Sequence, residues 1–259
     1  MGSSTPKQRA DTPLSLIHTP IFLTKKTDMW TEGASHMANL HNAIFRGYNS
    51  IYQQAPHVKV ADKSDFLGYC KTWCKFVKTH AAEEERKLFP MAEDLLREEV
   101  FKHTHEEHDA FVPALGDFAH YLDSLESPQD LSSERMLELM RAFQQPFEDH
   151  FRSEIDTIAA LASHSNSPEL GSKEYIASKA RFDKWGQSSV LTGGVTDVAM
   201  FLLFNLDRDF EDGLWKNWPE VPGPVRWVGS RVVGRWHGGW WKFASCDADG
   251  KRKELYALS

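Results

Sequence analysis

Hydrophobic side chains recur every three or four residues over four long stretches of the chain, 29–54, 64–88, 92–126 and 131–162. This spacing places them along one face of an α-helix. The first stretch is followed by Pro56 and the second by Pro90, and proline commonly marks the end of a helix. The pattern therefore predicts an all-α fold, an up-down-up-down four-helix bundle whose helices are joined by short loops.

The apolar stripe of the second predicted helix continues into two polar residues, His80 and Glu84. A charged carboxylate that faces a core is costly unless it is paired or binds a metal. Side chains four residues apart on a helix lie close enough to reach the same ion. The stripe therefore indicates a metal site within the bundle.

The fourth predicted helix repeats this arrangement, since its stripe runs through Phe147 to His150 and Glu154. With 12 His in the chain, about one His-x-x-x-Glu pair is expected by chance, so a single pair is weak evidence. The third such pair, His103 and Glu107, lies off the apolar stripe of its helix, and we expect it to be solvated.

The two remaining helices each carry a histidine on the apolar stripe. In a bundle these can converge with the other two pairs on one interior point, and imidazole together with carboxylate suits Fe, Mn or Zn. The predicted metal ligands are His41, His80, Glu84, His108, His150 and Glu154. A lone histidine on an apolar face is more often a satisfied core residue, and a helical interaction module without metal is the alternative.

The rest of the chain differs in character. Residues 1–28 are predicted to form an N-terminal arm, and residues 163–259 a C-terminal extension packed on the bundle at 29–162. Within the extension, 163–176 reads as a polar linker, 190–206 as a short helix and 239–257 as a hairpin around Asp249-Gly250. Six of the nine Trp lie between Trp215 and Trp241, which predicts an irregular, aromatic-rich extension.

Composition narrows the functional classes. A net charge of -7 does not favour nucleic acid as a partner. No apolar run approaches the ~20 residues that span a bilayer, and the first residues lack the apolar segment of a signal peptide. Three Cys argue against a disulfide-stapled secreted fold. We therefore expect a cytoplasmic protein with neither membrane nor nucleic acid as a partner.

The motifs taken together resemble the hemerythrin-like (HHE cation-binding) domain. They are HN at 41–42, HxxxEE…FP at 80–90, EHDAF at 107–111 and HFRSEI at 150–155, and the resemblance covers roughly 30–162. The C-terminal HGGWWKF…CDADG…LYA is similar to the extension of fungal stand-alone members.

The resemblance implies two non-haem irons, bridged by carboxylates and capped by histidines, that bind O2. His41, His80 and His108 would be caps, Glu84 a bridge, and His150 with Glu154 a second cap and bridge. The oxygen-carrying members have a further histidine four residues before the one at 108, and here that position is Thr104. His105 is a substitute candidate ligand, although it would point differently.

A site poorer in histidine is better suited to activating O2 than to carrying it. The sequence therefore favours a di-iron oxidase or oxygenase that acts on a small organic substrate. The alternative is a protein that binds or senses O2 or iron without catalytic turnover. Catalysis by a serine nucleophile has no support, because the chain contains no GxSxG elbow.

Overall fold

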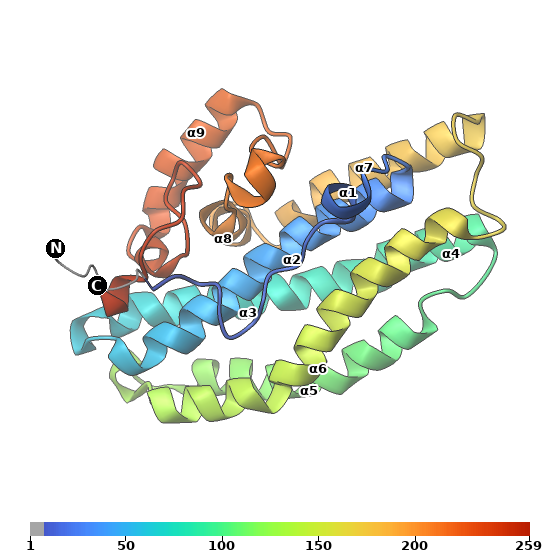
Figure 1. Cartoon of the computed structure of the whole chain (residues 1–259). Coiled ribbons are helices and arrows are strands. Elements are labelled where there is room, and N and C mark those ends of the chain that lie inside the picture. Colours follow the sequence, from blue (N-terminus) through green and yellow to red (C-terminus); the bar gives the residue numbers. More distant parts are fainter. Residues whose placement is uncertain (1–7) are drawn as a thin grey trace, which may run out of the picture.

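The computed structural model describes residues 8–259 and shows an all-α protein. Four helices form its bundle: α2 (Met29–Gln54), α3 (Lys63–Glu83), α5 (Lys102–Ser124) and α6 (Ser133–Ala160). Contacts between α2 and α3, α3 and α5, α5 and α6, and α6 and α2 close the ring (Figure 1). The predicted four-helix bundle is thus confirmed, while the up-down-up-down order of its helices stays a prediction.

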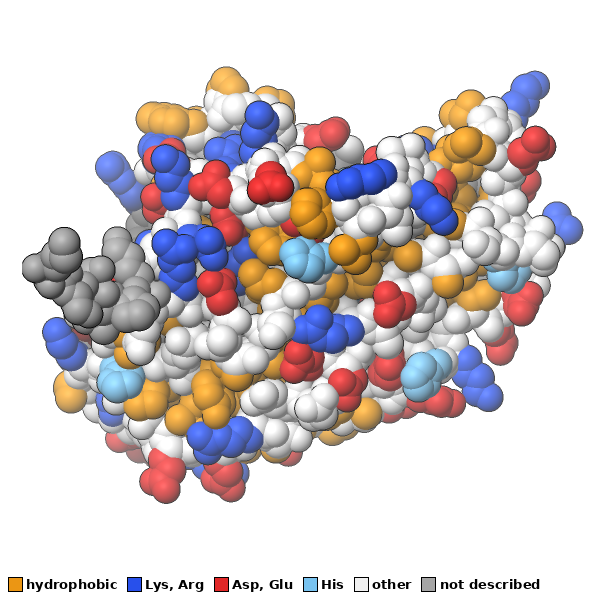
Figure 2. Space-filling view, in the orientation of Figure 1, with side chains coloured by type: hydrophobic (Ala, Val, Ile, Leu, Met, Phe, Trp, Pro, Cys, Tyr) orange, Lys and Arg blue, Asp and Glu red, His pale blue; other side chains and the backbone are white. Residues whose placement is uncertain are grey.

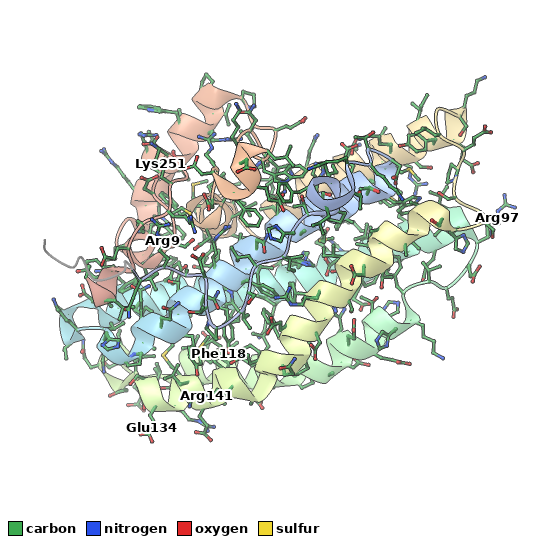
Figure 3. All side chains as sticks on the ribbon, in the orientation of Figure 1. Arg9, Arg97, Phe118, Glu134, Arg141 and Lys251 are labelled. Atoms are coloured by element: carbon green, nitrogen blue, oxygen red, sulfur yellow. The ribbon has the colours of Figure 1, made fainter. Side chains whose placement is uncertain are left out.

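The bundle interior is filled by apolar side chains. Phe118 is fully buried, whereas Glu134 and Arg141 point outward from α6 (Figure 3). Trp73 lies at the centre, where its Nε1 donates a hydrogen bond of 3.0 Å to the carbonyl oxygen of Ile44. Cys70, Cys74 and Cys246 are free and buried.

The second helix does not end before Pro90, and this prediction was wrong. After α3 the chain makes one π-helical turn (Glu84–Leu88) and continues as α4 (Phe89–Leu96), which ends where Arg97 adopts a left-handed conformation. Pro90 stands in the first turn of α4, where a missing N–H costs little. The third helix accordingly begins at Lys102 and not at residue 92.

The N-terminal arm lies along α2, although residues 1–7 fall outside the described part. Asn49 Oδ1 accepts a hydrogen bond of 2.8 Å from the Leu14 N–H, and Asn42 Oδ1 accepts one of 2.7 Å from the Ile17 N–H. The arm also contains the short helix α1 (Pro20–Thr24). Asn42 and Asn49, seven residues apart on α2, thus provide hydrogen-bond partners for backbone N–H groups of the arm that have none within a helix or sheet.

The extension contains α7 (Lys173–Thr192), α8 (Val198–Asn205) and α9 (Gly223–Arg231), connected by irregular segments and 3₁₀ turns. It covers α2 and α3, on which α7 and α8 both pack. The sequence did not predict α7, and the expected hairpin is reduced to one antiparallel bridge between Cys246 and Arg252. Trp227 and Trp236 are exposed, and apolar atoms gather over α9 at the upper edge of Figure 2.

No helix of residues 8–259 combines the length and the apolar character that crossing a membrane requires.

Two glycines of α2 provide a test of how tightly the extension is packed. A Cβ at Gly47 would lie 2.5 Å from side-chain atoms of both Phe201 and Trp73, whereas one at Gly33 would meet nothing within 4 Å. We expect Gly47→Ala to lower the free energy of unfolding by about 1–3 kcal/mol through overpacking. Gly33→Ala should raise it by roughly 0.5–1 kcal/mol, because alanine is the better helix former. Denaturant unfolding of both variants measures the difference, and equal effects would contradict close packing of α8 on the bundle.

Candidate metal centre

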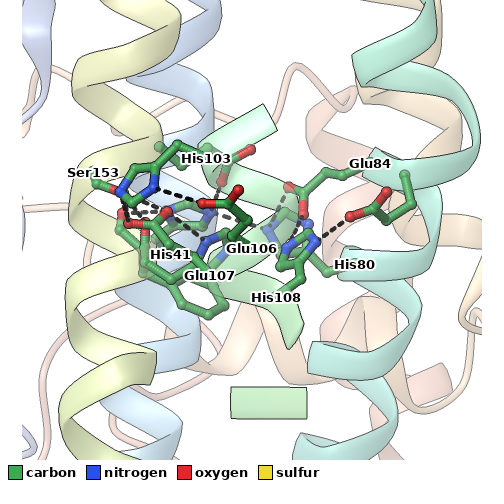
Figure 4. Close-up of polar contacts among 12 residues, drawn as sticks. His41, His80, Glu84, His103, Glu106, Glu107, His108 and Ser153 are labelled. Atoms are coloured by element: carbon green, nitrogen blue, oxygen red, sulfur yellow. Dashed lines mark hydrogen bonds and ion pairs between the residues drawn. The ribbon is translucent and has the colours of Figure 1, made fainter. Parts of the chain in front are cut away.

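Each of the four bundle helices directs at least one of the predicted ligands inward. His41 comes from α2, His80 from α3, Glu84 from the π turn that follows, and His108 from α5. His150 and Glu154 come from α6. All six residues are buried. Figure 4 shows His41, His80, Glu84 and His108 among the polar contacts of this cluster.

The first donor group consists of His41, His80, Glu84 and Glu154, whose nearest nitrogen and oxygen atoms all lie within 4.8 Å of one another. His41 Nε2 lies 3.0 Å from His80 Nε2 and 3.3 Å from Glu154 Oε2. His80 Nε2 lies 2.9 Å from Glu84 Oε1. The carboxylate of Glu154 thus joins His41 and His80, whereas the resemblance had paired it with His150.

The second donor group consists of Glu84, His108 and His150. Glu84 Oε2 lies 3.7 Å from His108 Nε2, and the ring centroids of His108 and His150 are 4.3 Å apart. Glu84 therefore belongs to both groups, and its two oxygens face different sets of histidines. A carboxylate placed in this way could contact a metal ion in either group.

A cation fits the donor set because the donors do not satisfy one another. Six buried atoms have no hydrogen-bond partner: both carboxyl oxygens of Glu84 and of Glu154, and the Nε2 atoms of His108 and His150. The short distances from Glu84 and Glu154 to histidine nitrogens thus lack hydrogen-bond geometry. Each buried polar group left unpaired costs about 1–3 kcal/mol. The mixture of imidazole and carboxylate donors suits Fe, Mn or Zn.

Burial also prepares the donors electrostatically. It lowers the pKa of His41 and of His80 to about 4, so both imidazoles are neutral and free to coordinate at neutral pH. Burial, together with the charge of Glu154, raises the pKa of Glu84 well above its ordinary value. The pKa of Glu154 falls to about 2, because its contacts with His41, His150 and His80 together outweigh its own burial. A bound cation would supply the positive charge that allows Glu84 to ionise as well.

Two glutamates that the sequence analysis did not predict contact the outer nitrogens of the second group. Glu85 Oε1 lies 2.6 Å from His108 Nδ1, and Glu107 Oε2 lies 3.4 Å from His150 Nδ1. The pair of His103 and Glu107 was expected to be solvated. This holds for His103, whose side chain is 77% exposed, but the side chain of Glu107 is only 15% exposed. The reason is that α6 packs against that side of α5, which no single-helix pattern can show.

His105 was a candidate extra ligand, and the structure corrects this. Its Nδ1 lies 2.6 Å from Glu85 Oε2, its side chain is 40% exposed, and it belongs to neither donor group. Because His105 is one position further along the helix than Thr104, its side chain points toward the carboxylate of Glu85. Thr104 itself is buried.

The fold and the site define a class: an α-helical bundle protein with a buried histidine–carboxylate group that could hold a metal ion. Residues 32–162 match the family model of the hemerythrin HHE cation binding domain, and the chain belongs to this family. It is also 30% identical over 224 residues to the "Dimeric xanthone biosynthesis cluster protein R11" of Cryptosporiopsis sp. (strain 8999). The matched region covers 86% of this chain and 81% of that protein. No solved structure matches the chain.

Proposed function

We propose that the protein is a non-haem di-iron protein that binds and activates O2. The observation that carries this proposal is the position of Glu84, whose two oxygens face separate donor groups. His41, His80 and Glu154 would hold one ion, His108 and His150 the other, and Glu84 would serve both. The donor set would also accept Mn or Zn.

Activation of O2, as opposed to reversible carriage, is supported by the side chains around the second group. Thr104 stands where the oxygen carriers place a further histidine, and His105 is paired with Glu85 instead of turning inward. Fewer protein ligands leave room for an exogenous one. Iron held by these residues would supply the electrons for O2 reduction, while the protein contributes the dry, fixed arrangement of donors.

A small organic substrate is supported by the relative, whose name places it in dimeric xanthone biosynthesis. The aromatic extension supports a substrate less, because several of its rings pack against the protein itself. Trp241 stacks on Phe204 with centroids 5.3 Å apart, and Phe243 packs on Phe66 at 4.9 Å. A protein that binds or senses O2 or iron without turnover is therefore the second candidate.

Oxygen consumption separates the two candidates. We expect protein loaded anaerobically with Fe(II) to consume O2 repeatedly when a reductant is supplied, as followed with an oxygen electrode. Zinc-loaded protein is the control, since zinc has no redox chemistry. A stable spectrum that forms with O2 and disappears under vacuum would instead establish carriage or sensing. Failure to bind iron at all would overturn both candidates.

A further inference from the structure

We propose that Glu85 and Glu107 are positioning residues that tighten metal binding at the position held by His108 and His150 and lower the reduction potential of the ion there. This inference rests on the proposed function, because it presupposes that both donor groups bind metal. Neither glutamate touches the interior of the site. Each acts through the outer nitrogen of a histidine that does.

His108 is held from both sides by consecutive glutamates. Its Nδ1 lies 2.6 Å from Glu85 Oε1, and its Nε2 lies 3.7 Å from Glu84 Oε2 on the inner side. Glu84 and Glu85 are the first two residues of the π turn, and their carboxylates face the inner and the outer nitrogen of the same histidine. Glu85 is itself fixed by His105, whose Nδ1 lies 2.6 Å from its second oxygen.

His150 is supported in the same way from its own side of the bundle. Its Nδ1 lies 3.4 Å from Glu107 Oε2, and the Ser153 hydroxyl donates a hydrogen bond of 2.6 Å to that carboxylate. Glu107, Ser153 and His41 appear on one side of the cluster in Figure 4, and Glu84 and His108 on the other. Both histidines of the second donor group therefore carry a carboxylate on their outer nitrogen.

The histidines of the first group are not supported in this way. His41 Nδ1 lies 2.9 Å from the backbone carbonyl oxygen of Phe151, which is a neutral acceptor. Within residues 8–259, no carboxylate contacts His80 except through the inner Nε2. The two donor groups thus share Glu84, but only the second has carboxylates on its outer nitrogens, whereas the first has the carboxylate of Glu154 on its inner side.

This difference has a direct chemical consequence. A carboxylate that accepts the outer N–H of a ligating imidazole fixes its tautomer and raises the basicity of the inner nitrogen. Additional negative charge nearby also favours a more highly charged ion. At the position of His108 and His150, the two glutamates are therefore expected to tighten the binding of a given divalent ion and to lower its reduction potential.

Glu85→Gln and Glu107→Gln test this inference, because glutamine keeps the size and an oxygen acceptor but removes the charge. Both positions lie at the rim, so the variants should fold normally, which circular dichroism checks. Glu106→Gln is the matched control: Glu106 is exposed, and its partner His103 keeps its second contact, at 3.3 Å from Glu107 Oε1, in this variant. Co(II), whose absorption reports coordination, is titrated into the metal-free full chain in competition with a chelator.

We expect two Co(II) equivalents in the wild type, and in each Gln variant one equivalent weakened by about 10–100-fold with the other unchanged. The midpoint potential of iron-loaded protein should also rise in Glu85→Gln and Glu107→Gln but not in Glu106→Gln. Affinities and potentials identical to the wild type, or equal weakening of both equivalents, would overturn the inference while leaving the metal site intact. A wild type that binds no Co(II) or iron would instead overturn the proposed function.

Discussion

Replacing Glu84 with leucine should have opposite effects on metal binding and on the stability of the metal-free protein. Both donor groups lose the ligand that they share, so bound iron should fall from two equivalents to less than one. The metal-free variant should be more stable by about 1–4 kcal/mol, because a buried carboxyl with two unpaired oxygens gives way to an apolar side chain of similar volume. Metal analysis and denaturant unfolding after chelation measure the two effects.

The matched control for this variant is Glu106→Leu, which removes an exposed carboxylate near the cluster without removing a ligand. It should retain both metal equivalents. Unchanged metal content in Glu84→Leu would show that the carboxylate is not shared between two ions. A less stable metal-free variant would contradict the inference that the Glu84 carboxyl is unpaired in the metal-free interior.

Removing the metal should destabilise the wild-type protein markedly. A ligand that binds only the folded state, present at a thousandfold excess over its dissociation constant, stabilises that state by about 4 kcal/mol. Chelation also leaves the six unpaired donor atoms in the interior without a partner. We expect the midpoint of urea unfolding to fall by more than 1 M, given a slope of about 1–3 kcal/mol per M.

The Glu84→Leu variant serves here as the insensitive reference, since it has little metal to lose. Its unfolding curve should move little when the chelator is added. Superimposable curves for wild-type protein with and without chelator would mean that the donor cluster is stable without an ion.

The sequence predicts those parts of the site that follow from the three- or four-residue spacing of side chains along one helix. Glu84 and Glu154 could be found because each follows a histidine by one turn on an apolar stripe. Glu85 and Glu107 could not, because their roles depend on how two helices are rotated against each other. Helix α7 was missed because only a few of its side chains, such as Tyr175 and Ser178, are buried, so its apolar pattern is weak.

The arm and the extension show a related limit. Glu211 is buried and accepts hydrogen bonds from the N–H of Thr19, from its hydroxyl and from Trp215 Nε1. It joins segments almost two hundred residues apart in the chain. No local pattern marks such a residue, because its neighbours in sequence read as an ordinary acidic turn.

The π turn at Glu84–Leu88 has a consequence for comparing this chain with its relatives. A single π turn is equivalent to one residue inserted into an α-helix, and it rotates everything after it by about 100° relative to everything before it. A homologue that lacks the insertion would therefore align with a one-residue gap between Glu84 and Phe89. In such a protein the side chain equivalent to Glu85 would turn away from the histidine equivalent to His108. That gap, visible in an alignment alone, would separate members with two alike iron positions from members in which the positions differ.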